Sequence, residues 1–329
     1  MAKFDYGAYF GPITPLADAL RDSPTRFWES TPEKLAQPHE YVLYLGCNVL
    51  RTMHLAEAIV AVLKALNVDF VTLGGPSNCC GIVHQRNGDL KVSTQLTQHT
   101  LDKFTQVQPK AVLMYCPSCH SHIDGALPKG ELDFDVPYLH VTQFIAERLG
   151  QLNFRTPIRR RIALHAHEGL PQQKLDTDYT RAILRAIPGL EIVDLPVGAE
   201  WGRACSESQI KAMGRARHDA LVAEMFAAAK AQACDGIVAV YHSCYREILP
   251  KEREHGLEWL NYVELVAASL ELGPFPARFK DMKLAEDPDA AYAALAPRMV
   301  ERGGNLSSLR RSVDAHFAPE SSGVEKPKG

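Results

Sequence analysis

The sequence has little that would suit a membrane, secretion or nucleic acid. Its best candidate for a membrane span, residues 58–66, carries Lys64 and is far shorter than the roughly 20 apolar residues that a transmembrane helix needs. The N-terminal residues MAKFDYGAYF have neither the basic nor the apolar region of a signal peptide. A net charge of −3 gives no sign of broad nucleic-acid binding. We therefore expect a cytoplasmic protein with no membrane span and no nucleic-acid partner.

The composition is that of an ordinary globular protein. Hydrophobic residues make up 46% and charged residues 23% of the 329 residues, which excludes wholesale disorder. The length is too great for one ordinary domain and suits two. A chain of this size can bury a full core without disulfide bonds.

The eight cysteines are the strongest indication of function in the sequence. They are Cys47, Cys79, Cys80, Cys116, Cys119, Cys205, Cys234 and Cys244. Because disulfide frameworks are unusual in the cytoplasm, clustered cysteines suggest metal binding or catalysis. Five fall in the first half with the pattern C-x31-CC-x35-C-x-x-C, and Gly81 follows the adjacent pair. Cys234 precedes a predicted strand and is expected to be a core thiol.

Each cysteine group of the first half follows a predicted strand. The apolar runs 41–45, 68–73 and 111–115 are typical of buried strands, and helices are predicted at 54–66 and about 88–107. Ligands bind at the carboxyl edge of open α/β sheets. We therefore expect the three groups to meet at one sheet edge.

These thiols suit an iron–sulfur cluster, whose ligands are thiolates, four in the ordinary case. Cys116 and Cys119 open a predicted helix, where free N–H groups stabilise thiolates. Gly81 allows the backbone to approach a cluster closely. One alternative is five inert, buried thiols. Another is a zinc site, but zinc takes four ligands in close pairs, and five thiols with an adjacent pair fit it poorly.

The same residues resemble a known family. Cys47, Cys79-Cys80-Gly81 and Cys116-Pro117-Ser118-Cys119 match the cysteine-rich CCG motif found in the B subunit of heterodisulfide reductase and in its relatives. The resemblance covers about residues 40–275. It implies that the five cysteines, with Gly81 beside them, hold a noncubane [4Fe–4S] cluster in which a thiolate bridges irons.

The second half repeats the first with most cysteines lost. Aligning 111–123 with 237–248 pairs Cys119 with Cys244 and Cys116 with Tyr241, and the same offset pairs Cys80 with Cys205. Aligning the strand 41–47 with 161–167 pairs Cys47 with His167, or with Glu168 after a shift of one residue. Further predicted elements are the strands 161–164, 190–195 and 236–241 and the helices 177–187 and 209–230. We predict an α/β protein of two pseudo-symmetric halves, each a small, mainly parallel sheet flanked by helices.

The surviving residues of the second motif leave three interpretations open. They are a different metal centre, a metal-free pocket for a partner or substrate, and plain packing. The candidate ligands are His167, Cys205, Cys244, His165 and His242. Two cysteines with two histidines suit zinc, and they also resemble the ligands of a Rieske-type [2Fe–2S] centre.

Histidines near the first motif are candidate proton donors. His84 and His120 are close in sequence to Cys80 and Cys119, and thiolates released from a disulfide must take up protons. The simpler interpretation, which we favour, is that these histidines are solvated helix residues.

Four segments are expected. They are an N-terminal arm (1–40), a CCG half with the complete motif (41–155), a CCG half with the degenerate motif (156–275), and a C-terminal helical extension with a disordered tail (276–329). The tail, residues 320–329, is polar.

The resemblance implies an oxidoreductase subunit that acts within a heterodisulfide-reductase-like complex, on disulfides, thiols or sulfane sulfur. The degenerate second motif favours a B-type subunit of the sulfur-oxidising system. The implied partners are a flavoprotein A subunit, a ferredoxin-like C subunit and a lipoyl-carrying protein. No GxGxxG fingerprint follows a predicted strand, so we expect electrons to come from partner subunits. The alternatives are an electron-transfer subunit of a lactate- or glycolate-type oxidation complex and a zinc-stabilised scaffold with no redox role.

Overall fold

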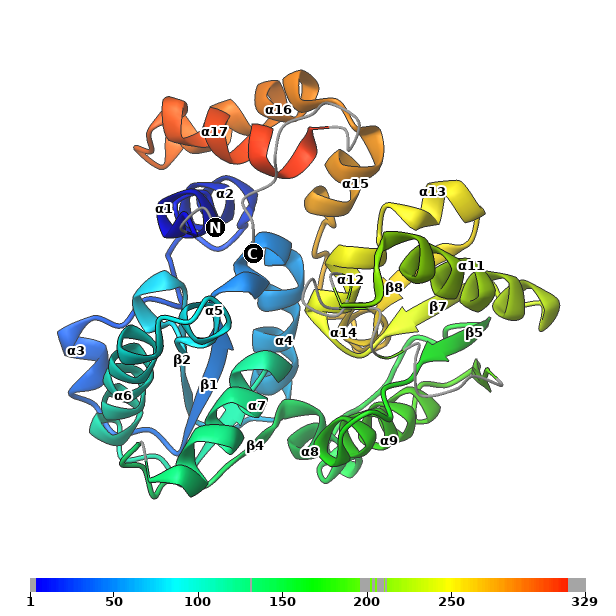
Figure 1. Ribbon diagram of the computed structural model, residues 1–329. Coiled ribbons are helices and arrows are strands. Elements are labelled where there is room, and N and C mark those ends of the chain that lie inside the picture. The colour runs from blue at the N-terminus through cyan, green and yellow to red at the C-terminus, as the bar shows by residue number, and fades with distance from the viewer. Residues whose placement is uncertain are drawn as a thin grey trace. The chain divides into compact units, whose positions relative to one another are not determined.

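The computed structural model describes residues 4–130, 132–195, 202, 205, 210 and 212–318. The chain forms two compact units, each with one four-stranded sheet (Figure 1). Unit 1 comprises residues 1–56, 68–140 and 277–329, and unit 2 comprises residues 57–67 and 141–276.

The sheet of unit 1 is parallel, with the strand order β2-β1-β3-β4. Its strands are β1 Tyr41–Gly46, β2 Phe70–Gly74, β3 Ala111–Met114 and β4 Tyr138–His140. β1 and β3 are apolar and almost entirely buried, as is usual for central strands covered on both faces. The three predicted strands are confirmed, and they are neighbours in the sheet.

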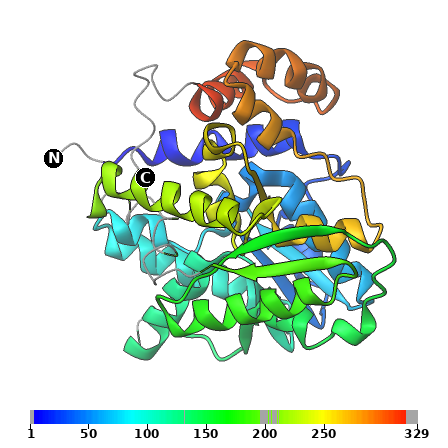
Figure 2. The ribbon, with the colours of Figure 1, turned by 90° about the vertical axis from the view of Figure 1, so that its right-hand side faces the viewer.

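The sheet of unit 2 repeats this topology, with the parallel order β6-β5-β7-β8. Its strands are β5 Arg160–His165, β6 Leu190–Asp194, β7 Gly236–Ala239 and β8 Glu258–Asn261. Figure 2 turns the green strands of this sheet toward the viewer. The predicted α/β fold with two similar halves is confirmed.

The sequence pattern does not predict β4 and β8, which occupy the same edge position in the two sheets. They have three and four residues, too few to show a period of two. Each leads directly into a helix, α8 Val141–Ala146 or α14 Tyr262–Ser269. Asn261 and Glu264 form a capping box that starts α14.

The other helices connect the strands or form the two terminal segments. They are α1 Tyr6–Phe10, α2 Ile13–Leu20, α3 Pro32–Leu35, α4 Met53–Ala65, α5 Ile82–Arg86, α6 Leu90–Gln106, α7 Pro117–Ala126, α9 Pro171–Arg185, α11 Arg215–Ala231, α12 His242–Ile248, α13 Lys251–His255, α15 Arg278–Ala285, α16 Pro288–Glu301 and α17 Leu306–Phe317. The helices predicted at 54–66, 88–107 and 177–187 correspond to α4, α6 and α9. The one predicted at 209–230 corresponds to α11, and its first residues fall partly outside the described ones. Within the described ranges, no helix is both long and apolar enough to cross a membrane.

The two terminal segments pack together in unit 1 (Figures 1 and 2). Helix α2 contacts α16 and α17, and its apolar side chains repeat at helical spacing on a buried face. Arg298 donates hydrogen bonds of 2.7 Å to the carbonyls of Ala19 and Arg21 at the end of α2. Asp22 accepts hydrogen bonds of 2.8 Å from Arg298 and Arg278. These contacts satisfy carbonyls that a helix end leaves without partners. The predicted disordered tail, 320–329, lies outside the described residues.

Candidate metal centres

The five cysteines of the first half lie at the carboxyl ends of the adjacent strands β2, β1 and β3. Cys47 directly follows β1, and the Cys79-Cys80 pair follows β2 after the 3₁₀ helix η2 Pro76–Asn78. Cys116 is the N-cap of α7, and Cys119 lies in the first turn of that helix. All five are buried free thiols. The parallel sheet thus brings three sequence-distant groups to one edge.

The thiols influence one another electrostatically. Along the order Cys47, Cys79, Cys80, Cys119 and Cys116, the pKa of each of the first four thiols depends on a neighbour. The buried ring of Tyr44 lies close by, and burial together with the negative charge of these thiols raises the pKa of its hydroxyl well above the usual value. Five sulfurs are more donors than a single zinc ion takes.

The electrostatics of this group favour a cationic occupant. A hydrogen bond with Cys79, followed by burial, raises the pKa of Cys47 well above its ordinary value. Cys79 differs, because hydrogen bonds from Cys47 and Cys80, aided by the Gly81 N–H, lower its pKa to about 3. Five buried thiolates repel one another, so they can be ionised together only beside a positive charge. Cysteines that bind a metal do so as thiolates. The donor set therefore fits an iron–sulfur cluster.

Two glycines keep the space around these sulfurs clear. Gly46 has φ +70°, and a Cβ there would lie 3.0 Å from the Cys119 sulfur. Gly81 has φ +81°, and a Cβ there would lie 2.4 Å from the Ser93 carbonyl oxygen of α6. Glycine adopts positive φ without the cost that other residues incur. Gly46 thus leaves room beside Cys119, and Gly81 lets the adjacent cysteines pack against α6.

Helix α6 holds the backbone of the Cys79-Cys80 pair through two buried threonines. The Thr97 hydroxyl donates to the Cys80 carbonyl at 2.7 Å, and the Thr100 hydroxyl donates to the Cys79 carbonyl at 2.9 Å. Thr97 also contacts Nε2 of His122 at 3.0 Å. The sequence does not predict a role for either threonine, because a hydroxyl group on a polar helix belongs to no motif. Their spacing of three residues, on one helix face, is the only signal.

The two candidate proton donors are buried, so the favoured interpretation of solvated helix residues is wrong. His84 is stacked on Tyr6, and its Nδ1 lies 3.3 Å from an oxygen of Asp89. His84 is also close enough to Cys79 to lower the pKa of that thiol by its charge. His120 lies with Nε2 3.6 Å from an oxygen of Asp124. The aromatic N-terminal arm and the turn after α5 account for the burial of His84, and neither is visible from sequence spacing.

A cavity of about 370 Å³ adjoins the threonine and histidine contacts. Thr97 and His122 line it, and Lys91 and Lys129 add positive charge to its wall. These residues come from α6, α7 and η3 Leu127–Lys129, so the sequence alone does not associate them. The cavity leads from the protein surface to side chains that hold the cysteine backbone.

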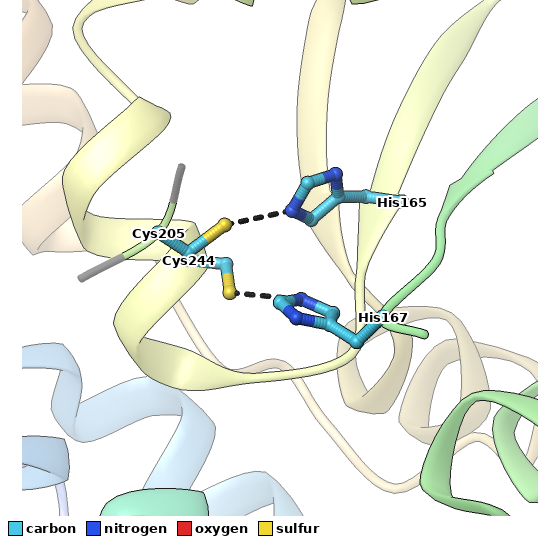
Figure 3. Close-up of side chains that lie close together, drawn as sticks. All are labelled: His165, His167, Cys205 and Cys244. Carbon is cyan, nitrogen blue, oxygen red and sulfur yellow. Dashed lines mark hydrogen bonds between the residues drawn. The ribbon is translucent and has the colours of Figure 1, made fainter. Parts of the chain in front are cut away.

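A second group of potential ligands lies in unit 2. The ligand atoms of His165, His167, Cys205 and Cys244 all lie within 4.8 Å of one another, and all four residues are buried. Nε2 of His165 is 2.7 Å from the Cys205 sulfur, and Nε2 of His167 is 3.2 Å from the Cys244 sulfur (Figure 3). His242, the fifth candidate, is buried but does not belong to this group.

The electrostatics favour the metal-binding forms of His165 and Cys244, whereas burial and the neighbouring Cys244 raise the pKa of Cys205 well above its ordinary value. Burial lowers the pKa of His165, which favours the neutral ring. Burial opposes ionisation of Cys244, but contacts with Cys205, His167 and His165 lower its pKa well below the ordinary value. Neutral imidazole and thiolate are the forms that bind metals.

Strand register defines part of the correspondence between the two groups. Tyr44 pairs with Met114 at the end of β3, and His165 pairs with Ala239 at the end of β7. His165 therefore takes the place of Tyr44. The register of β1 shifts by one residue between Tyr44 and Gly46, so the strand pairs do not fix which residue of unit 2 corresponds to Cys47, and its alignment with His167 or with Glu168 stays a prediction.

The other correspondences hold as predicted. Tyr241 is the N-cap of α12 as Cys116 is of α7, and Cys244, like Cys119, is the third residue of its helix. Cys205 and Cys244 shift each other's pKa, as do Cys80 and Cys119. The second half thus keeps one interacting pair of cysteines and adds two imidazoles.

Comparison with known proteins agrees with this arrangement of the first half. Residues 41–124 match the family model of the cysteine-rich domain named CCG. This segment is similar to CCG domains. The matched segment begins at β1, ends within α7 and contains all five cysteines. The resemblance to CCG proteins of the heterodisulfide reductase type is therefore confirmed.

Curated relatives of the chain are named as redox proteins. The D subunit of the dihydromethanophenazine:CoB–CoM heterodisulfide reductase of Methanosarcina barkeri is 28% identical, over 56% of this chain and 47% of its own. The EtfAB:quinone oxidoreductase of Syntrophomonas wolfei is 26% identical, over 50% of this chain and 24% of its own. A probable membrane-anchored ferredoxin of Chromohalobacter salexigens is 28% identical, over 50% of this chain and 26% of its own. The chain thus spans less than half the length of these relatives.

Proposed function

We propose that this chain is the iron–sulfur subunit of a heterodisulfide-reductase-like complex. Cys47, Cys79, Cys80, Cys116 and Cys119 hold a noncubane [4Fe–4S] cluster. The reaction is the interconversion of disulfides and thiols, or of sulfane sulfur, with sulfur oxidation as the physiological setting. The observation that carries the proposal is the gathering of five buried, electrostatically coupled thiols at one sheet edge.

The electron and proton balance defines what the protein must provide. Reduction of a disulfide consumes two electrons and two protons and yields two thiols, and oxidation reverses this balance. When bound, the cluster supplies or accepts these electrons one at a time. A partner flavoprotein and a ferredoxin-like subunit exchange electrons with this chain, and a lipoyl-carrying protein is a candidate carrier of the substrate.

The chain's own residues hold the thiolates and exclude water. Cys116, Cys80 and burial raise the pKa of Cys119 well above its ordinary value, so its thiolate form would need the positive charge of a bound cluster. Thr97 and Thr100 fix the carbonyls of the cysteine pair. The cavity beside Thr97 is the proposed approach for a small thiol or disulfide, and Lys91 and Lys129 suit an anionic one.

The test is metal and sulfide analysis of anaerobically purified protein, with an EPR spectrum after oxidation in the presence of thiol. We expect about four irons per chain and a signal that added thiol or disulfide perturbs. Cys80→Ser should lose the iron, whereas Cys234→Ser should keep it, because Cys234 is a buried thiol outside both ligand groups. Full iron content in Cys80→Ser would refute the ligand assignment, and protein without iron after reconstitution would refute the redox function.

A second candidate is a relay that passes electrons from a flavoprotein toward quinone without acting on sulfur substrates. The similarity to the EtfAB:quinone oxidoreductase favours it. An iron signal that responds to reductants but not to added thiol or disulfide would support this candidate over the first.

A further inference from the structure

We propose that His165, His167, Cys205 and Cys244 bind one zinc ion in a closed, four-coordinate site in unit 2. This inference does not depend on the iron–sulfur proposal, because the two ligand sets share no residue. It assigns a ligand to the degenerate half of the repeat.

The four donors already form a compact set. Their ligand atoms lie within 4.8 Å of one another, and each sulfur contacts a ring nitrogen, at 2.7 Å for Cys205 with His165 and at 3.2 Å for Cys244 with His167. Ligand distances of about 2.3 Å for Zn–S and about 2.0–2.1 Å for Zn–N keep the four donors of one ion mutually close. The group therefore has the dimensions of a single-ion site.

A Rieske-type cluster does not fit this arrangement. In such a cluster the two cysteines bind one iron and the two histidines bind the other. The cysteine sulfurs are then separated from the imidazole nitrogens by both irons. Here each sulfur touches an imidazole nitrogen (Figure 3). A tetrahedral set of two sulfurs and two nitrogens suits either zinc or an iron–sulfur cluster. Because the cluster does not fit, zinc is the remaining candidate.

The comparison between the two halves also favours a single ion over a cluster. Gly46 leaves the space beside the Cys119 sulfur clear in unit 1, where a Cβ would lie 3.0 Å from that sulfur. In unit 2 Cys244 corresponds to Cys119, and the ring of His167 contacts its sulfur. An imidazole thus fills the room that a polynuclear cluster would need, and it adds a ligand for a single ion.

The surroundings orient the histidine rings for this role. Nδ1 of His165 lies 3.1 Å from the sulfur of Met225, which turns Nε2 toward Cys205. The Thr177 hydroxyl bonds the backbone N–H and carbonyl of His167, at 2.9 and 3.1 Å. Contacts of this kind fix the orientation of metal ligands. Four buried protein ligands leave no open position, which is typical of a structural zinc site.

The experiment is zinc analysis of the full chain, purified anaerobically, with X-ray absorption at the zinc edge. We expect about one zinc per chain, with two sulfurs at about 2.3 Å and two nitrogens at about 2.0–2.1 Å. Cys244→Ser and His165→Gln should each lower the zinc content severalfold while the iron content stays unchanged. Cys80→Ser should do the reverse, so failure of one proposal is distinguishable from failure of the other.

If the unit 2 variants do not fold, the wild-type protein still gives a decisive test. Titration with the chelator 4-(2-pyridylazo)resorcinol should remove zinc and lower the melting temperature of the protein without releasing iron. The proposal is overturned by protein without zinc, by zinc bound through oxygen and nitrogen alone, or by Cys244→Ser that retains zinc. Iron that is lost with Cys244 would overturn it in favour of a second iron centre.

Discussion

His167 contacts Cys244, with 3.2 Å between Nε2 and the sulfur, whereas in the first half a glycine, Gly46, lies beside the corresponding sulfur of Cys119. Gly46 leaves that sulfur open. The two halves share a sheet topology and a helix start, yet they present different donors. Five thiols suit a polynuclear cluster, whereas two thiols with two imidazoles suit a single ion.

The first prediction concerns Gly46. Gly46→Ala should lower the iron content severalfold, because the added Cβ would lie 3.0 Å from the Cys119 sulfur and 3.1 Å from the Cys116 Cβ. Gly88→Ala is the matched control, since Gly88 also has a positive φ, +80°, but a Cβ there meets nothing within 4 Å. Both variants carry the backbone cost of a non-glycine residue at positive φ, about 1–2 kcal/mol. Iron and sulfide analysis separates the effects, and equal iron content in the two variants would contradict the role of Gly46.

The second prediction concerns Gly202, which lies against His167. A Cβ on Gly202 would lie 2.9 Å from the His167 Cα, so Gly202→Ala must displace one of the two backbone segments. We expect weaker zinc binding in a chelator competition, with iron content unchanged. Gly150→Ala in the same unit is the control, because a Cβ there has open space. Equal zinc affinity in the two variants would show that the approach of Gly202 to His167 does not support the site.

The sequence predicts the central strands of both sheets and the approach of the five cysteines, because both follow from local patterns. β1 and β3 are continuous apolar runs, and a parallel sheet necessarily gathers their carboxyl ends at one edge. The sequence does not predict β4 and β8, because their pairing depends on neighbouring strands rather than on their own three or four residues.

The site residues that the sequence misses are those that act through tertiary contacts. Thr97 holds Cys80 from a helix whose pattern indicates only a polar surface. His84 is buried because Tyr6, 78 positions earlier in the numbering, stacks on it. The alignment of Cys47 with His167 or with Glu168 stays open for a similar reason, since strands 41–47 and 161–167 show similar apolar patterns in either alignment. The pairing of β5 with β7 fixes the register only as far as His165.

The third prediction concerns Thr97. Thr97→Val keeps the shape of the side chain but removes the hydroxyl that donates to the Cys80 carbonyl at 2.7 Å. An unsatisfied buried carbonyl costs about 1–3 kcal/mol, so the cysteine pair should be held less firmly. We expect faster iron loss to a chelator and a shifted midpoint potential in an EPR-monitored redox titration. Thr105→Val on the same helix is the control, because its hydroxyl bonds only the Leu101 carbonyl among the interactions of the described structure. Identical iron loss from both variants would argue against a positioning role for Thr97.

The last prediction concerns the contact between the terminal segments. Burial opposes ionisation of Asp22, but hydrogen bonds and charge from Arg278 and Arg298 lower its pKa below the ordinary value. When folding lowers the pKa of a carboxyl group, the ionised group stabilises the folded protein at pH values above the unfolded pKa of about 3.9. This contribution disappears as the pH falls through the pKa of the folded state. Asp22→Asn should therefore lower the melting temperature at pH 7, and the difference from wild type should shrink below about pH 4. Thermal unfolding followed by circular dichroism at several pH values measures this, with the exposed Asp133→Asn as the control. A difference that stays constant down to pH 3 would mean that Asp22 contributes through packing, because a contribution from its charge must vanish once the carboxyl group is protonated.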